Sequence, residues 1–203
     1  MDRLNIFNPY KDKGDEHEDV LTRNFLILLK NISSVQVAFI EMIRDKMKTV
    51  EIESLGLGEL EITEIRTQVH SNTFLSNLQG YRAVSVVISD DKYDGAHVVK
   101  KSNRRAIYDG VVQCDPAWIF VIENKPFVGN IWEGQFDPNH SDVTNNVLIE
   151  ELCCLSWREI IHVLNNLIEH NMVDCLERVL IEDFLMYINE EYSWFNPYDR
   201  FGI

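Results

Sequence analysis

The strongest constraint on the fold is a pair of apolar, β-prone runs joined by a short turn that contains proline. The runs are Ala106 to Gln113 and Trp118 to Asn124, and the turn between them is Cys114-Asp115-Pro116-Ala117. Proline pre-sets the backbone angle of a turn and cannot donate a hydrogen bond within a central strand, so the chain is expected to reverse here. The sequence therefore predicts an antiparallel β-hairpin in the middle of the chain.

The turn also predicts which residues of the two strands face each other. In a hairpin centred on Pro116, opposed residues have numbers that sum to about 232, which places Asp109 opposite Glu123. Opposed Cβ atoms of neighbouring strands lie roughly 5 Å apart. Glu123 and Lys125 share one face of their strand, whereas Asn124 points to the other. Two facing acids repel each other in a dry core and one ammonium group neutralises only part of their charge, so the pattern favours a divalent cation.

The residue types at the end of this hairpin suit phosphodiester hydrolysis. Carboxylate oxygens are ligands that Mg²⁺ and Mn²⁺ prefer, and these ions also take waters and substrate phosphate oxygens. A lysine beside such an ion can orient or deprotonate the attacking water and stabilise charge on the phosphate. The alternative is that Glu123 and Lys125 form an exposed pattern on an edge strand. The apolar run Trp118 to Ile122 argues against it, because such a run is typical of a central strand.

The rest of the chain predicts helices, then strands, then helices, which is the pattern of an α/β layer fold in a single domain over residues 1–203. Capping signals and apolar residues at helical spacing predict the helices, and β-branched runs predict the strands. The stretch Val147 to Leu155 is ambiguous, and we expect a strand because a capping box restarts at Ser156. The predicted helices run from Glu16 to Asn31, Val35 to Met47, Trp157 to His170 and Val173 to Glu191, and the other strands from Glu59 to His70 and Tyr81 to Ile88.

A third acid, Glu18, lies on the first predicted helix. It precedes Leu21 by three residues and Phe25 by seven, so it falls on the apolar stripe and is predicted to point inward. The alternative is a first-turn acid that the helix dipole favours without any metal.

These residues resemble a known family. Tyr108-Asp109-Gly110 and Glu123-Asn124-Lys125, with thirteen positions between Asp109 and Glu123, look like the split motif of the PD-(D/E)XK, or restriction-endonuclease-like, nucleases. The resemblance implies a restriction-endonuclease-like core, a central mixed β-sheet flanked by helices, and metal-dependent hydrolysis of nucleic acid. It also implies that Asp109, Glu123 and the backbone carbonyl of Asn124 hold Mg²⁺ or Mn²⁺ while Lys125 positions the water.

Two further features belong to this resemblance. A helical glutamate such as Glu18 is a frequent additional site residue, and Gln135 looks like the glutamine of the helix that follows the motif. Two departures are Tyr108, where the family name has proline, and Asp137-Pro138-Asn139, which interrupts the helix expected around Gln135. Gln135 is therefore either a site residue or a surface residue.

The charge is uneven along the chain. There are 19 Lys and Arg against 33 Asp and Glu, a net charge of −14, which argues against adhesion to nucleic acid or anionic membranes through bulk charge. Residues 131–203 carry −11 of it, whereas residues 82–105 carry +3. In that basic segment Lys100, Lys101, Arg104 and Arg105 either form a solvated loop or grip the phosphate backbone. We expect the second, with weak DNA affinity that falls as salt rises.

The sequence thus predicts a Mg²⁺- or Mn²⁺-dependent DNA endonuclease, and the resemblance adds, by analogy, a role in bacterial antiviral defence. Cutting both strands requires two sites, so a homo-oligomer or a larger defence complex is expected. No signal peptide or membrane span is recognisable, which predicts a cytoplasmic protein with no membrane partner. Two alternatives are a non-catalytic interaction subunit with a nuclease-like fold and an RNA-cleaving enzyme.

Overall fold

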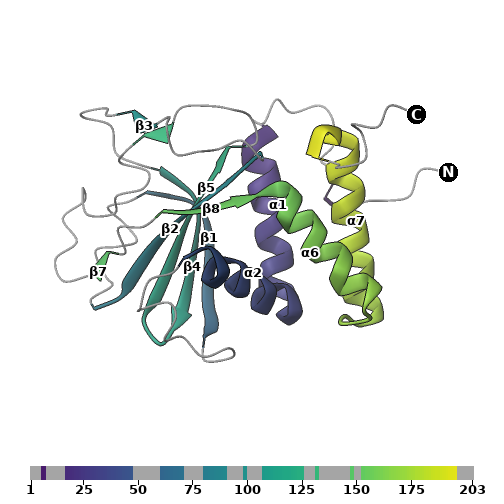
Figure 1. The fold of residues 1–203 in the computed structure, drawn as a ribbon, viewed down its shortest axis with the longest axis horizontal. Helices are drawn as coiled ribbons and strands as arrows, with labels where there is room; N and C mark the ends of the chain where they lie inside the picture. Colours follow the sequence, from purple (N-terminus) through teal and green to yellow (C-terminus); the bar gives the residue numbers. More distant parts are fainter. Residues whose placement is uncertain are drawn as a thin grey trace.

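The computed structural model describes residues 6–7, 17–47, 60–70, 80–90, 98–99, 107–125, 131–132, 147–148 and 152–195. For residues 17–19, 98–99, 131–132 and 147–148 it describes the backbone alone. The chain is an α/β protein in which helices pack against a mixed β-sheet (Figure 1).

The predicted hairpin forms the middle of this sheet. Its strands, β4 (Ile107–Asp115) and β5 (Trp118–Lys125), pair antiparallel. On one side, β1 (Glu61–His70) pairs antiparallel with β4, and on the other side β2 (Arg82–Ser89) pairs parallel with β5. The short strands β7 (Val147–Leu148) and β8 (Cys153–Ser156) both pair parallel with β2, one near each of its ends. A separate two-stranded sheet pairs β3 (Val98–Val99) with β6 (Ile131–Trp132).

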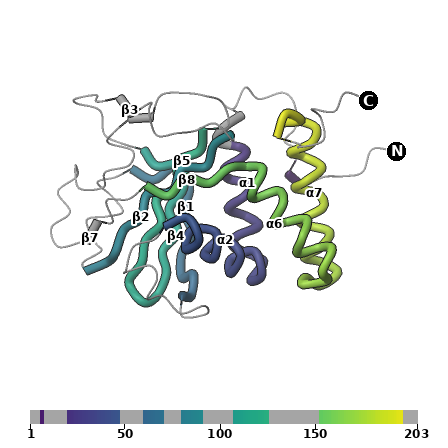
Figure 2. The backbone as a smooth tube through the Cα atoms, viewed as in Figure 1, coloured from purple at the N-terminus to yellow at the C-terminus, as the bar shows by residue number. Residues whose placement is uncertain are grey.

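The described helices lie together on one side of the sheet, as the ribbon and the backbone tube both show (Figures 1 and 2). They are α1 (His17–Asn31), α2 (Ser33–Lys46), α6 (Trp157–Glu169) and α7 (Cys175–Glu191), followed by the short 3-10 helix η3 (Ser193–Phe195). No one of these helices is long and apolar enough to cross a membrane, and α1 and α2 meet that criterion only as a pair bent by 113°.

Strand β5 is buried on both faces. Trp118, Phe120 and Ile122 belong to the large core cluster shared with the four helices. Ile119 and Val121, which alternate with them, belong to a second cluster. A strand that is buried on both faces needs a continuous apolar run, which explains the composition of residues 118–122.

The predicted elements form with small differences at their ends. Helix α2 begins at Ser33, not after the Ser33-Ser34 pair, because the break is the single extended residue Ile32, whose side chain is buried. The hairpin strands run further than predicted, so only Pro116 and Ala117 remain in the turn, and Ala117 takes a positive φ of 56°. The ambiguous stretch 147–155 contains the two strands β7 and β8.

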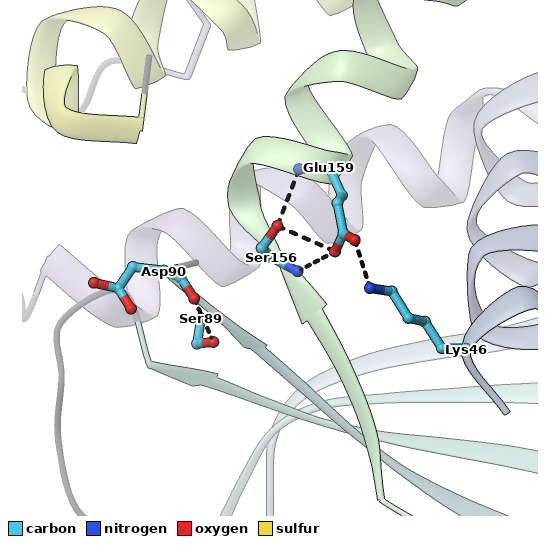
Figure 3. A network of polar contacts seen from close by, with 5 residues as sticks. All are labelled: Lys46, Ser89, Asp90, Ser156 and Glu159. Carbon is cyan, nitrogen blue, oxygen red and sulfur yellow. Dashed lines mark hydrogen bonds and ion pairs between the residues drawn. The ribbon is translucent and has the colours of Figure 1, made fainter. Parts of the chain in front are cut away.

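The predicted capping box at the start of α6 is present and connects α6 to α2 (Figure 3). The Ser156 side chain accepts a hydrogen bond from the backbone N–H of Glu159, and the Glu159 carboxylate accepts one from the backbone N–H of Ser156. The same carboxylate forms an ion pair with Lys46 at the end of α2. One side chain therefore holds the start of α6 against a neighbouring helix.

The free energy of unfolding at acidic pH is expected to depend on the protonation of Glu159. Partial burial raises the pKa of its carboxyl, but hydrogen bonds from Lys46 and Ser156 and the charge of Lys46 outweigh burial, so the pKa lies below 4.5. A carboxylate with a lowered folded-state pKa stabilises the fold above its unfolded pKa, and this contribution disappears as pH falls through the folded pKa. We expect Glu159→Gln to be less stable than wild type near neutral pH and the difference to shrink below pH 4.5. Urea denaturation at several pH values measures it, and a difference independent of pH contradicts the prediction.

Candidate active site at the open end of the hairpin

The register of the hairpin is the predicted one. The paired residues run from Cys114 and Trp118, beside the turn, to Gly110 and Ile122, and the numbers in each pair sum to 232. Asp109 precedes Gly110 and Glu123 follows Ile122, so the two acids lie directly beyond the last of these pairs. The two acids therefore come from neighbouring strands at the open end of the hairpin.

Asp109 is fixed across the hairpin by a hydrogen bond to the main chain of β5. Its Oδ2 accepts the backbone N–H of Asn124, with 2.8 Å between the oxygen and the nitrogen. The residue is buried, with 9% of its surface exposed. A carboxylate that accepts a backbone N–H is held in one orientation.

Glu123 and Lys125 form an ion pair on one face of β5. Nζ of Lys125 lies 2.9 Å from Oε1 of Glu123, and the two side chains are 18% and 2% exposed, respectively. Taking a carboxylate out of water costs several kcal/mol unless a cation and hydrogen bonds compensate. Lys125 supplies such a cation, and its side chain is the more exposed of the two.

Asn124 points to the opposite face, as predicted from strand alternation. It is 0% exposed, and its Oδ1 accepts a hydrogen bond from Nε1 of Trp157, with 2.9 Å between the two atoms. Asn124 is therefore bonded on both sides, through its side chain to the helical layer and through its backbone N–H to Asp109.

The alternative that Glu123 and Lys125 form an exposed pattern on an edge strand is wrong. β5 lies between β4 and β2 in the sheet. The parallel register pairs Val87 with Glu123 and Ser89 with Lys125, so both residues have a β2 neighbour. The apolar run of β5 thus identified a central strand correctly.

Four of the predicted site residues come together in the described part of the chain, namely Asp109, Glu123, Asn124 and Lys125. Glu18 lies in the first turn of α1, but its side chain is outside the described residues. The other predicted site residues, Gln135, Lys100, Lys101, Arg104 and Arg105, also lie outside the described residues. Their roles stay predictions.

The donor set at the hairpin end fits a hard divalent cation. Asp109 and Glu123 provide carboxylate oxygens on adjacent strands, and Mg²⁺ is commonly bound by only one or two protein carboxylates together with water and phosphate. Among the described residues, no group of three or more His, Cys, Asp or Glu side chains could hold a metal ion. That criterion needs three side chains, whereas Asp109 and Glu123 are two.

A cavity of about 800 Å³ is lined in part by the end of β2, the strand next to the one that carries Lys125. Ser89, the register partner of Lys125, lines it, as do Asp90 at the end of β2 and Lys46, Ser156 and Glu159, which Figure 3 draws. The position of β2 beside β5, and so of Ser89 beside Lys125, has no signal in the local sequence, because it depends on pairing between segments far apart in the chain.

Comparison with known proteins gives no relative: no protein-family model, curated protein or solved structure matches the chain. The chemistry of the site is therefore inferred from its residues and their geometry.

Proposed function

We propose that this protein is a metal-dependent nuclease of the PD-(D/E)XK type, with a restriction-endonuclease-like core, and that it hydrolyses phosphodiester bonds of DNA as an endonuclease. The observation that carries the proposal is the buried Glu123 carboxylate, ion-paired with Lys125 at the end of a central strand. Asp109 lies on the neighbouring strand, directly beyond the last residue that pairs with β5. Its carboxylate accepts the backbone N–H of Asn124, the residue between Glu123 and Lys125.

The site residues divide the work between holding an ion and handling the water. Asp109, Glu123 and the carbonyl oxygen of Asn124 would hold Mg²⁺ or Mn²⁺, with Glu18 as a further candidate. When bound, such an ion supplies Lewis acidity toward a phosphate oxygen and a water. Cleavage by attack of water on the phosphorus would leave a 5′-phosphate and a 3′-hydroxyl, as the family resemblance implies.

Lys125 would position the attacking water and stabilise negative charge on the phosphate. Glu123 holds its ammonium group at 2.9 Å, and the Lys125 side chain is the more exposed member of the pair. A preoriented cation stabilises developing charge without having to reorganise during the reaction. The ion pair therefore serves to aim the ammonium group as well as to stabilise the fold.

The proposal predicts plasmid cleavage that depends on Mg²⁺ or Mn²⁺ and on this ion pair. Lys125→Ala and Glu123→Ala should each lower the cleavage rate by about 100-fold or more, because each removes charge from the reacting centre. The chain offers a matched control in Glu64 and Arg66 of β1, which have the same spacing and a 2.7 Å ion pair but are exposed. Arg66→Ala should cleave at the wild-type rate in a time course of supercoiled plasmid.

The outcomes separate the candidate functions. Equal cleavage by wild type, Lys125→Ala and Glu123→Ala excludes this active site. Absence of cleavage by every variant, on DNA and on structured RNA, supports the non-catalytic interaction subunit, and cleavage of structured RNA in preference to plasmid supports an RNA-cleaving enzyme. Because cutting both strands requires two sites, we also expect the active species to be an oligomer, which light scattering of the purified protein tests.

A further inference from the structure

We infer that Trp157 is a positioning residue of the proposed active site, and that it acts through Asn124 on the Asp109 carboxylate. Its catalytic consequence rests on the proposed nuclease function. The structural part of the inference, that the indole N–H sets the position of the end of β5, can be tested without any cleavage assay.

Two consecutive hydrogen bonds carry the inference. The indole Nε1–H of Trp157 donates to Oδ1 of Asn124 at 2.9 Å, and the backbone N–H of Asn124 donates to Oδ2 of Asp109 at 2.8 Å. Asn124 and Trp157 are both 0% exposed, and Asp109 is buried. Hydrogen bonds between groups shielded from water are strong and costly to leave unmade.

Trp157 is itself held firmly, so the direction of its N–H is fixed. It is the first residue of α6 and directly follows Ser156, whose capping box fixes the start of that helix (Figure 3). Its ring stacks on Phe195 with 6.0 Å between centroids and meets the ring of Phe25 edge-on at 5.7 Å. An indole packed in this way cannot follow the strand if the strand shifts, so it acts as a fixed anchor.

The anchored residue is the one between the two members of the catalytic ion pair. A shift of Asn124 moves its carbonyl oxygen, which the proposed function assigns to the metal, and breaks or lengthens its bond to Asp109. Groups that orient metal ligands from behind typically change metal affinity or activity by about 10- to 100-fold when they are removed. Trp157 is therefore expected to matter for the site beyond its contribution to the core.

The test compares Trp157→Phe with Trp118→Phe in the full chain. Trp118 is a matched control because it is 1% exposed in the same core cluster and stacks on Phe120, but lies at the opposite end of β5 from the site. Both variants lose an indole from the core. Only Trp157→Phe loses the donor to Asn124.

The first measurement is the NMR chemical shift of the Asn124 backbone amide, which donates to Asp109. We expect Trp157→Phe to shift this resonance and Trp118→Phe to leave it unchanged. If Trp157→Phe does not fold, a benzothienyl alanine at position 157, which replaces the N–H by sulfur and keeps the ring shape, takes its place. An unchanged Asn124 amide, or the same change in both variants, overturns the inference.

The second measurement is cleavage of plasmid with Mn²⁺. Trp157→Phe should lower kcat by about 10- to 100-fold and raise the Mn²⁺ concentration for half-maximal activity, with KM for DNA unchanged. Trp118→Phe should keep wild-type values for all three. Parallel losses in the two variants reduce Trp157 to a packing residue. If wild type does not cleave nucleic acid, the proposed function fails, and the amide measurement still decides whether Trp157 positions Asp109 through Asn124.

Discussion

Replacing Lys125 by methionine is expected to lower the cleavage rate by about 10²- to 10³-fold, because it removes a preoriented cation from the reacting phosphate. It should also lower the free energy of unfolding. The Glu123 side chain is 2% exposed and loses the ammonium group at 2.9 Å. Breaking a fully buried ion pair costs about 3–5 kcal/mol, and the 18% exposure of Lys125 reduces this to about 2–3 kcal/mol.

The double variant Glu123→Gln/Lys125→Met separates the structural role of the pair from its chemical role. A neutral amide and a thioether of similar size leave no charge at these two positions, and such replacements of buried ion pairs are often neutral or stabilising. We therefore expect the free energy of unfolding of the double variant to lie within about 1 kcal/mol of that of wild type. It should remain inactive, because both the proposed metal carboxylate and the positioning ammonium are gone.

Urea denaturation and plasmid cleavage on the same protein samples measure both effects. Recovered stability without recovered cleavage supports a catalytic role for the pair. Recovered cleavage in the double variant shows that the ion pair serves the fold alone. The Arg66→Met variant, which breaks the exposed pair of β1, should change the free energy of unfolding by less than about 1 kcal/mol.

The hairpin and its site were predictable because they are local. The proline turn and the alternation of the strands fixed which residues face each other, so the 232 register followed from residue numbers alone. The apolar run of β5 indicated a buried strand. Charged residues at the end of such a strand, here Glu123 and Lys125, need a compensating partner or serve a function.

The surroundings of the site depend on contacts between distant segments and were not predictable in the same way. A strand from Tyr81 to Ile88 was predicted and forms as β2, but its pairing with β5 is set by how the layers pack. Trp157 packs in the core, yet its indole N–H also bonds to Asn124, 33 residues earlier in the chain. The sequence does not distinguish a tryptophan that only packs from one that also donates a hydrogen bond to a site residue, because the tertiary fold decides which acceptor its N–H reaches.

The second large effect is expected at Phe25, whose ring lies where four helices meet. Phe25 of α1 is 2% exposed, and its ring contacts Phe39 of α2, Trp157 of α6 and Phe184 of α7, with centroid distances of 5.7, 5.7 and 6.4 Å. Truncating such a ring loses its burial and leaves a cavity that close-packed neighbours fill only in part. We expect Phe25→Ala to lower the free energy of unfolding by about 3–5 kcal/mol, measured by urea denaturation.

The same substitution tests whether the helical layer supports the site. Phe25 meets Trp157 edge-on, so the cavity frees the indole that bonds to Asn124. Phe25→Leu, which fills more of the space, should cost less stability and retain more activity than Phe25→Ala. The control Val37→Ala on α2, where the side chain is 47% exposed, should change stability by less than about 0.5 kcal/mol. A loss at Phe25 as small as the loss at Val37 means that the aromatic cluster does not hold the four helices together, and the anchor for the end of β5 then lacks its support.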